Sequence, residues 1–128
     1  MSESHKILIV EDVMLNMMLI KKLVRVHCPD AIILEATDGQ QGVNVFIEQQ
    51  PDLIFMDIHM PVLDGYLATQ SIRSFAEENA LKQPIVVALS AGSSKLDQKK
   101  ADEAGMNDFL AKPVDIIVLK QLLDRYLS

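Results

Sequence analysis

Five short apolar runs alternate along the chain with longer stretches in which apolar residues recur at helical spacing. The runs cover residues 6–11, 31–36, 53–57, 84–90 and about 109–111, and they predict β-strands. Helices are predicted after each run, with the clearest boundaries at about 14–26, 66–79, 94–104 and from about 115 onward. Near-continuous apolar strands are typical of a parallel sheet that is buried on both faces. The alternation therefore predicts an α/β fold with one parallel sheet covered by helices on both sides.

The helical stretches carry apolar stripes at a spacing of three or four residues. The stripes consist of Leu15, Leu19, Leu23 and Val26 in the first helix, Val43, Phe46 and Ile47 in the second, Leu67, Ile72 and Phe75 in the third, and Ile116, Leu119, Leu123 and Leu127 in the last. We expect the stripes of the second and last helices to face the sheet, as in amphipathic helices generally.

Length and composition fit one globular domain. At 128 residues, with 49% hydrophobic and 23% charged residues, the chain is long enough to bury one continuous core. It contains no linker, repeat or low-complexity stretch. We therefore expect a single domain over residues 1–128, in which residues 1–5 form a short N-terminal tail.

The charge and the N-terminal segment limit the partners and the compartment. A net charge of −6 argues against direct nucleic-acid binding, which depends on basic side chains. The apolar run at 7–10 is too short for a signal peptide or a membrane span, and Cys28 is the only cysteine, so no intrachain disulfide can form. These features predict a cytoplasmic protein that does not enter a membrane.

Polar residues stand where the predicted strands end. Glu11 and Asp12 follow the first strand, Asp57 ends the third, Ser90 ends the fourth and Lys112 follows the fifth. In open α/β sheets, ligands bind outside the carboxyl ends of the strands. The fold would therefore gather these residues at one edge of the sheet.

This combination of groups suits phosphoryl chemistry with a metal ion. Three carboxylates at one site repel each other, and a bound Mg²⁺ would relieve the repulsion because it prefers oxygen ligands. A lysine and a serine hydroxyl could then hold the equatorial oxygens of a transferring phosphoryl group. The nucleophile in such a site would be a carboxylate, which forms an aspartyl phosphate.

Four stretches at the strand ends together resemble the receiver domain of two-component response regulators. They are ILIVED at 7–12, PDLIFMDIHMPVLDG at 51–65, VVALSA at 86–91 and EAGMNDFLAKPV at 103–114. The resemblance covers essentially the whole chain. It implies a flavodoxin-like, doubly wound sheet of five parallel strands in the order 2-1-3-4-5.

The resemblance also implies an acceptor and a metal site. Asp57 would accept a phosphoryl group from a histidine kinase or a histidine phosphotransfer protein. Asp12 and Asp57 would bind Mg²⁺ directly, Glu11 through water, and His59 through its backbone carbonyl. The chain would then be a signalling switch and no conventional enzyme, since it catalyses only its own phosphotransfer and slow dephosphorylation.

Further roles follow from the same resemblance. Ser90 and Lys112 would bind phosphoryl oxygens, Ser90 and Phe109 would act as the switch pair, and Pro113 would follow a cis peptide bond. The output face would comprise the helix at 94–104, the strand at 109–111 and the last helix. A downstream protein or a second copy of the chain would bind there.

Several alternatives remain open from the residues alone. A haloacid-dehalogenase-like phosphatase would need a second aspartate two positions after the nucleophile, where this chain has His59, and a cap insertion. A flavin-binding flavodoxin would need a loop rich in Ser, Thr and Gly after the first strand. A pseudo-receiver would lack phosphorylation altogether. Among single residues, Asp12 could merely cap the first helix, Phe109 could be ordinary core, and the charged segment 95–100 could be a solvated helix face.

Overall fold

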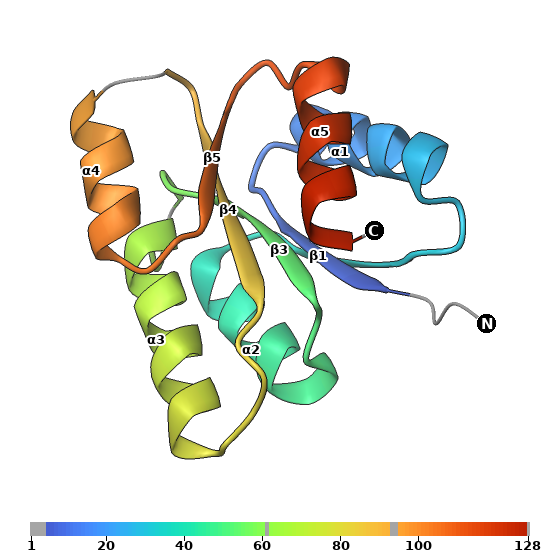
Figure 1. Cartoon of the computed structure of the whole chain (residues 1–128). Helices are drawn as coiled ribbons and strands as arrows, with labels where there is room; N and C mark the ends of the chain where they lie inside the picture. The colour runs from blue at the N-terminus through green and yellow to red at the C-terminus, as the bar shows by residue number, and fades with distance from the viewer. Residues whose placement is uncertain (1–4, 61, 93–94, 128) are drawn as a thin grey trace.

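The computed structural model describes residues 5–60, 62–92 and 95–127. In this part of the chain, five parallel strands alternate with five helices, and the strand order is β2-β1-β3-β4-β5 (Figure 1). The strands are β1 (Lys6–Val10), β2 (Ile32–Ala36), β3 (Leu53–Asp57), β4 (Ile85–Ser90) and β5 (Asp108–Ala111). The helices are α1 (Met14–His27), α2 (Gly39–Gln49), α3 (Gly65–Glu78), α4 (Lys95–Glu103) and α5 (Ile116–Leu127). The predicted flavodoxin-like fold and its strand order are confirmed.

The sheet separates two apolar cores. Helices α1 and α5 cover one face, and α2, α3 and α4 cover the other (Figure 1). Alternate residues of a strand point to opposite faces of a sheet. Accordingly, Ile7 and Ile9 of β1 pack toward α1 and α5, whereas Leu8 and Val10 pack toward α2 and α3. Burial on both faces explains why the central strands are continuously apolar.

The first helix presents a different face to the core than its leucine spacing indicates. Its buried residues are Met17, Ile20 and Val24, whereas Leu15 and Val26 are 76% and 61% exposed. The sequence of α1 is apolar on more than one side, so the periodicity alone cannot select the inward stripe. Exposed members also occur in the other predicted stripes, namely Ile47, Leu67 and Ile116.

The predicted element boundaries are correct to within one or two residues, except at Ser94, which lies outside the described residues. The structure does not support the alternative in which Asp12 only caps α1. The N-cap residue of this helix is Val13, and it makes no side-chain capping hydrogen bond. Asp38 and Asp64 cap α2 and α3, through side-chain bonds from the amides of Gln41 and Leu67. The interpretation of Asp12 as a helix cap is therefore wrong.

The parallel register brings the ends of the central strands together. Val10 pairs with Met56, Asp57 pairs with Leu89, and Ser90 pairs with Ala111. The residues that follow these pairs lie at one edge of the sheet. Over the described parts of the chain, no helix combines the length and the apolar character needed to cross a bilayer.

Candidate functional site

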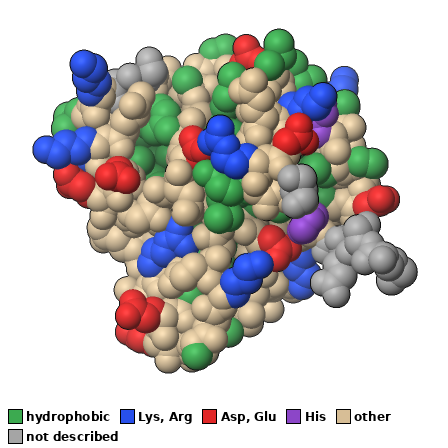
Figure 2. Space-filling view, in the orientation of Figure 1, with side chains coloured by type: hydrophobic (Ala, Val, Ile, Leu, Met, Phe, Trp, Pro, Cys, Tyr) green, Lys and Arg blue, Asp and Glu red, His purple; other side chains and the backbone are tan. Residues whose placement is uncertain are grey.

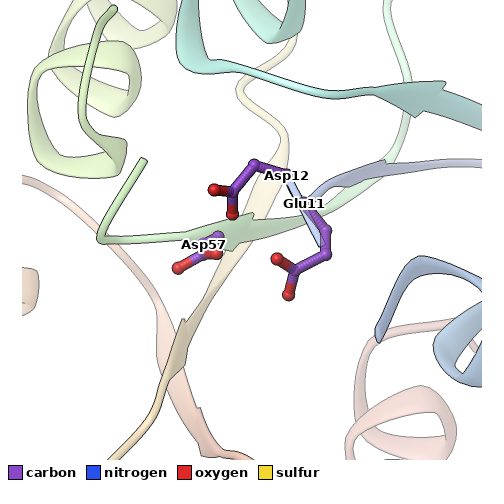
Figure 3. Close-up of side chains that lie close together, drawn as sticks. All are labelled: Glu11, Asp12 and Asp57. Carbon is purple, nitrogen blue, oxygen red and sulfur yellow. The ribbon is translucent and has the colours of Figure 1, made fainter. Parts of the chain in front are cut away.

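Three carboxylates meet at the carboxyl edge of the sheet. Glu11 and Asp12 follow β1, and Asp57 is the last residue of β3 (Figure 3). Each offers one oxygen, and these oxygens lie within 4.8 Å of one another. Glu11 and Asp57 are 1% and 2% exposed, while Asp12 is open to solvent. This arrangement of hard oxygen ligands fits a divalent cation such as Mg²⁺.

Lys112 supplies the positive charge that faces the cluster. Its Nζ lies 2.7 Å from Oε1 of Glu11 and 3.0 Å from Oδ2 of Asp57, and its side chain is only 16% exposed. Burial alone would lower the pKa of the Lys112 ammonium, but its hydrogen bonds to Glu11 and Asp57 and the charges of both carboxylates raise that pKa overall. The ammonium therefore stays charged, and one cation faces three anions. The remaining negative charge favours a metal ion at the same place.

Backbone groups orient the two buried carboxylates. Oε2 of Glu11 accepts a hydrogen bond from the Val13 amide at 3.1 Å, and Oδ1 of Asp57 accepts one from the His59 amide at 3.1 Å. The first turn of α3 also packs directly on the end of β3. A Cβ atom at Gly65 would collide with the Asp57 carbonyl oxygen, so only glycine allows this approach. The strand end that carries Asp57 is thus fixed from two sides.

Ser90 lies at the end of β4, but its hydroxyl contacts another carboxylate. Its Oγ donates to Oδ2 of Asp97 at 3.4 Å and accepts a hydrogen bond from the Gly92 amide at 3.3 Å. The Ser90 carbonyl accepts a hydrogen bond from the Lys112 amide at 2.6 Å, which ties the ends of β4 and β5 together. The structure therefore brings Glu11, Asp12, Asp57 and Lys112 into direct proximity, with Ser90 buried beside them.

Three further residues were predicted for the site from the sequence. The His59 side chain is 62% exposed, and its Nε2 lies 3.9 Å from Oδ2 of Asp97. The His59 backbone amide donates a hydrogen bond to Asp57. The peptide bond between Lys112 and Pro113 is cis, as the resemblance implies. Phe109 is partly buried against the core on the α2–α4 side, and it lines a hollow of about 180 Å³ with Ala101 and Asp102 of α4.

Two residues beside Ser90, Asp97 and its partner Tyr66, were not predicted from the sequence. The Tyr66 hydroxyl donates to Oδ1 of Asp97 at 3.4 Å, so the carboxylate joins α3, α4 and the end of β4. The interpretation of 95–100 as a solvated face is wrong at Asp97, whose side chain is only 21% exposed. The available signal was its place in the first turn of the helix that follows Ser90.

Fold and site together define a doubly wound α/β domain with a cluster of three carboxylates and one lysine at the carboxyl edge of its sheet. The family described as "Response regulator receiver domain" matches residues 7–124. The chain therefore belongs to the response regulator receiver family. It is a signalling domain and not a conventional enzyme, and the phosphatase and flavodoxin alternatives are set aside.

Relatives in longer signalling proteins share this domain. The chain is 31% identical to hybrid signal transduction histidine kinase L of Dictyostelium discoideum, over 94% of this chain and 7% of that protein. It is 34% identical to the osmolarity two-component system protein SSK1 of Saccharomyces cerevisiae, over 86% of this chain and 18% of that protein. The chain thus spans only a small part of these relatives.

Two solved structures are similar in both fold and sequence. One is the receiver domain of Saccharomyces cerevisiae Ssk1, co-crystallised with the histidine phosphotransfer signalling protein Ypd1. It has a TM-score of 0.89 and 35% identity, with 96% of this chain and 88% of that chain covered. The other is the receiver domain of the Pseudomonas aeruginosa sensor histidine kinase PA1611, with a magnesium ion coordinated in its active-site cleft. It has a TM-score of 0.81 and 35% identity, with 97% of this chain and 98% of that chain covered.

Proposed function

We propose that this chain is a phosphorylation-dependent signalling switch that accepts a phosphoryl group on Asp57. The observation that carries the proposal is the setting of Asp57, which is 2% exposed and sits 3.0 Å from Lys112 within a cluster of carboxylates. Such a setting needs an additional cation and can stabilise an anionic group in transfer. The family membership supports the same chemistry.

Magnesium is the proposed cofactor. Asp12 and Asp57 would ligate it directly, Glu11 through water, and the His59 carbonyl would complete the protein ligands. The spacing of the three carboxylate oxygens supports this set, and the receiver of PA1611 holds magnesium in its cleft. When bound, Mg²⁺ neutralises charge on the phosphoryl oxygens.

The chain's own residues would then perform the transfer. An oxygen of Asp57 attacks the phosphorus of a phosphohistidine, a P–O bond forms, and the P–N bond breaks as the imidazole leaves. Lys112 holds one equatorial oxygen with its ammonium, and the Ser90 hydroxyl moves to hold another. Phe109 would turn into the space that Ser90 leaves, so that the α4–β5–α5 face changes shape for a downstream protein or a second copy.

A histidine phosphotransfer protein is the proposed donor, and a histidine kinase is the alternative donor. The receiver of Ssk1 forms a complex with such a protein, Ypd1. In this chain, an apolar surface suited to a protein partner starts directly after Asp12, where Met14, Leu15 and Met18 of α1 are 69%, 76% and 57% exposed. Hydrophobic side chains are visible at the surface over α1 and α5 in Figure 2, among charged residues of both signs.

Acetyl phosphate with Mg²⁺ tests the proposal without a partner. Intact-mass spectrometry should detect one added phosphoryl group on the wild-type protein and on Asp30→Asn, an exposed control far from the site in sequence. Asp57→Asn should stay unmodified while its circular dichroism spectrum remains that of the wild type. A wild-type protein that stays unmodified, or a modified Asp57→Asn protein, would refute the proposal and favour a pure interaction module.

A further inference from the structure

One carboxylate outside the acidic cluster contacts three elements around the site. Asp97, in the first turn of α4, accepts from the Ser90 hydroxyl at 3.4 Å and from the Tyr66 hydroxyl at 3.4 Å. The His59 ring stands 3.9 Å away on the loop after β3. Asp97 therefore links α4 to the end of β4, to α3 and to the loop that follows Asp57.

The contact with Ser90 competes with the proposed role of Ser90. A hydroxyl has a single proton to donate. In this structure the Ser90 hydroxyl directs that proton to Asp97 and accepts from the Gly92 amide. It can donate to a phosphoryl oxygen on Asp57 only after it leaves Asp97.

We propose that Asp97 is a positioning residue that holds Ser90 away from the acceptor site and so opposes phosphorylation of Asp57. The inference rests on the proposed function of Asp57. It gives α4 a direct means of sensing the phosphoryl group, because the Ser90 hydroxyl can satisfy only one of the two anions at a time.

Charge acts in the same direction as the hydrogen bond. A phosphoryl group adds a charge of about −1.5 to −2 at neutral pH. Asp97 is negative and mostly buried, and it shares the Ser90 hydroxyl with that group. The two anions repel each other, so phosphorylation should push the first turn of α4 away from the site. By thermodynamic linkage, a partner that stabilises the displaced α4 would favour phosphorylation to the same degree.

Tyr66 keeps the Asp97 carboxylate in place. Its hydroxyl donates to Oδ1, whereas the Ser90 hydroxyl donates to Oδ2. Burial, then the charge of Asp97 and the hydrogen bond to it, raise the pKa of Tyr66 to about 12, so the phenol stays a donor. Removal of this hydroxyl should therefore weaken the restraint on Ser90 without removing the carboxylate.

Beryllofluoride, which mimics the phosphoryl group, allows the test on the full chain. Its dissociation constant in the presence of Mg²⁺ can be measured by titration calorimetry or NMR. Asp97→Ala should bind it about tenfold more tightly than wild type, a difference of about 1.4 kcal/mol. Glu103→Ala is the matched control, since it removes the same charge from an exposed position of α4 and should leave affinity unchanged. Tyr66→Phe should tighten binding in the same direction by a smaller factor.

A Ser90→Ala background shows whether Asp97 acts through Ser90. There, the added Asp97→Ala change should tighten binding by a clearly smaller factor, because only the charge repulsion is then relieved. The inference is overturned if Asp97→Ala matches Glu103→Ala, or if its gain is undiminished without the Ser90 hydroxyl. Should Asp97→Ala fail to fold, it is overturned if Tyr66→Phe binds no more tightly than wild type. In each of these cases wild-type binding of beryllofluoride would still uphold the proposed function, whereas a wild type that binds none would refute that function itself.

Discussion

Replacement of Lys112 by methionine should destabilise the metal-free protein severely, because it leaves two buried carboxylates without their cation. The ammonium lies 2.7 Å from Glu11 and 3.0 Å from Asp57, whose side chains are 0% and 3% exposed. At an effective dielectric constant of about 20, each pair gains about 6 kcal/mol before the cost of desolvation. Breaking a buried ion pair at one partner typically costs about 3–5 kcal/mol, since the other charge stays buried. That loss is a large share of the 5–15 kcal/mol or so that usually holds a domain together.

Urea unfolding at neutral pH, followed by far-ultraviolet circular dichroism with a chelator present, measures this loss. Lys99→Met is the matched control, because Lys99 pairs with Glu103 at 4.0 Å and both side chains are well exposed. It should change the free energy of unfolding by less than about 0.5 kcal/mol. Millimolar Mg²⁺ should restore part of the stability of Lys112→Met, and the added change Asp57→Asn should restore part of it without metal.

The electrostatic account of the site fails if Lys112→Met and Lys99→Met lose the same stability. It also fails if neither Mg²⁺ nor Asp57→Asn restores any stability to Lys112→Met. Methionine keeps most of the apolar stem of lysine, so lost packing cannot imitate the predicted pattern of rescue.

Three further predictions follow from individual contacts. The pKa of Lys112 is raised in the folded state, so the stability from its ion pairs is present below the ordinary lysine pKa of about 10.4 and is lost as pH rises through the higher folded pKa. The difference in unfolding free energy between wild type and Lys112→Met should therefore close in that alkaline range. Asp12→Ala should lose the thermal stabilisation by Mg²⁺ yet melt no lower than metal-free wild type, because one of three repelling charges is gone; equal Mg²⁺ stabilisation in both proteins would exclude Asp12 as a ligand. Val62→Gly should raise the free energy of unfolding by about 1 kcal/mol, since Val62 has a φ of 71° and is 81% exposed. The control Val26→Gly in α1 should lower the free energy of unfolding, and a lower urea midpoint for Val62→Gly than for wild type would contradict this reasoning.

The fold and most of the acidic site could be predicted from the sequence because both depend on local patterns. Buried parallel strands require continuous apolar runs, and parallel strands place their last residues at one edge. Glu11, Asp57 and Lys112 follow such runs, so their proximity depended only on the order of the strands.

Other features depend on tertiary packing and left little trace in the sequence. The inward face of α1 could not be chosen, because Leu15 and Met17 are equally apolar and only the position of the helix on the sheet decides between them. In the sequence, Asp97 is indistinguishable from the other charged residues of a polar helix. Only the tertiary structure shows that it contacts Ser90. The left-handed backbone at Val62 was hidden by a residue type that disfavours it.

The identity of the modified residue tests the central claim most directly. Acyl phosphates are reduced by borohydride, which converts a phosphorylated aspartate into homoserine. The wild-type protein would be treated with acetyl phosphate and Mg²⁺, reduced, digested and sequenced by tandem mass spectrometry. The account predicts homoserine at position 57 alone, and none when Mg²⁺ is chelated. Homoserine at Asp12 or another aspartate, or none at position 57, would contradict it.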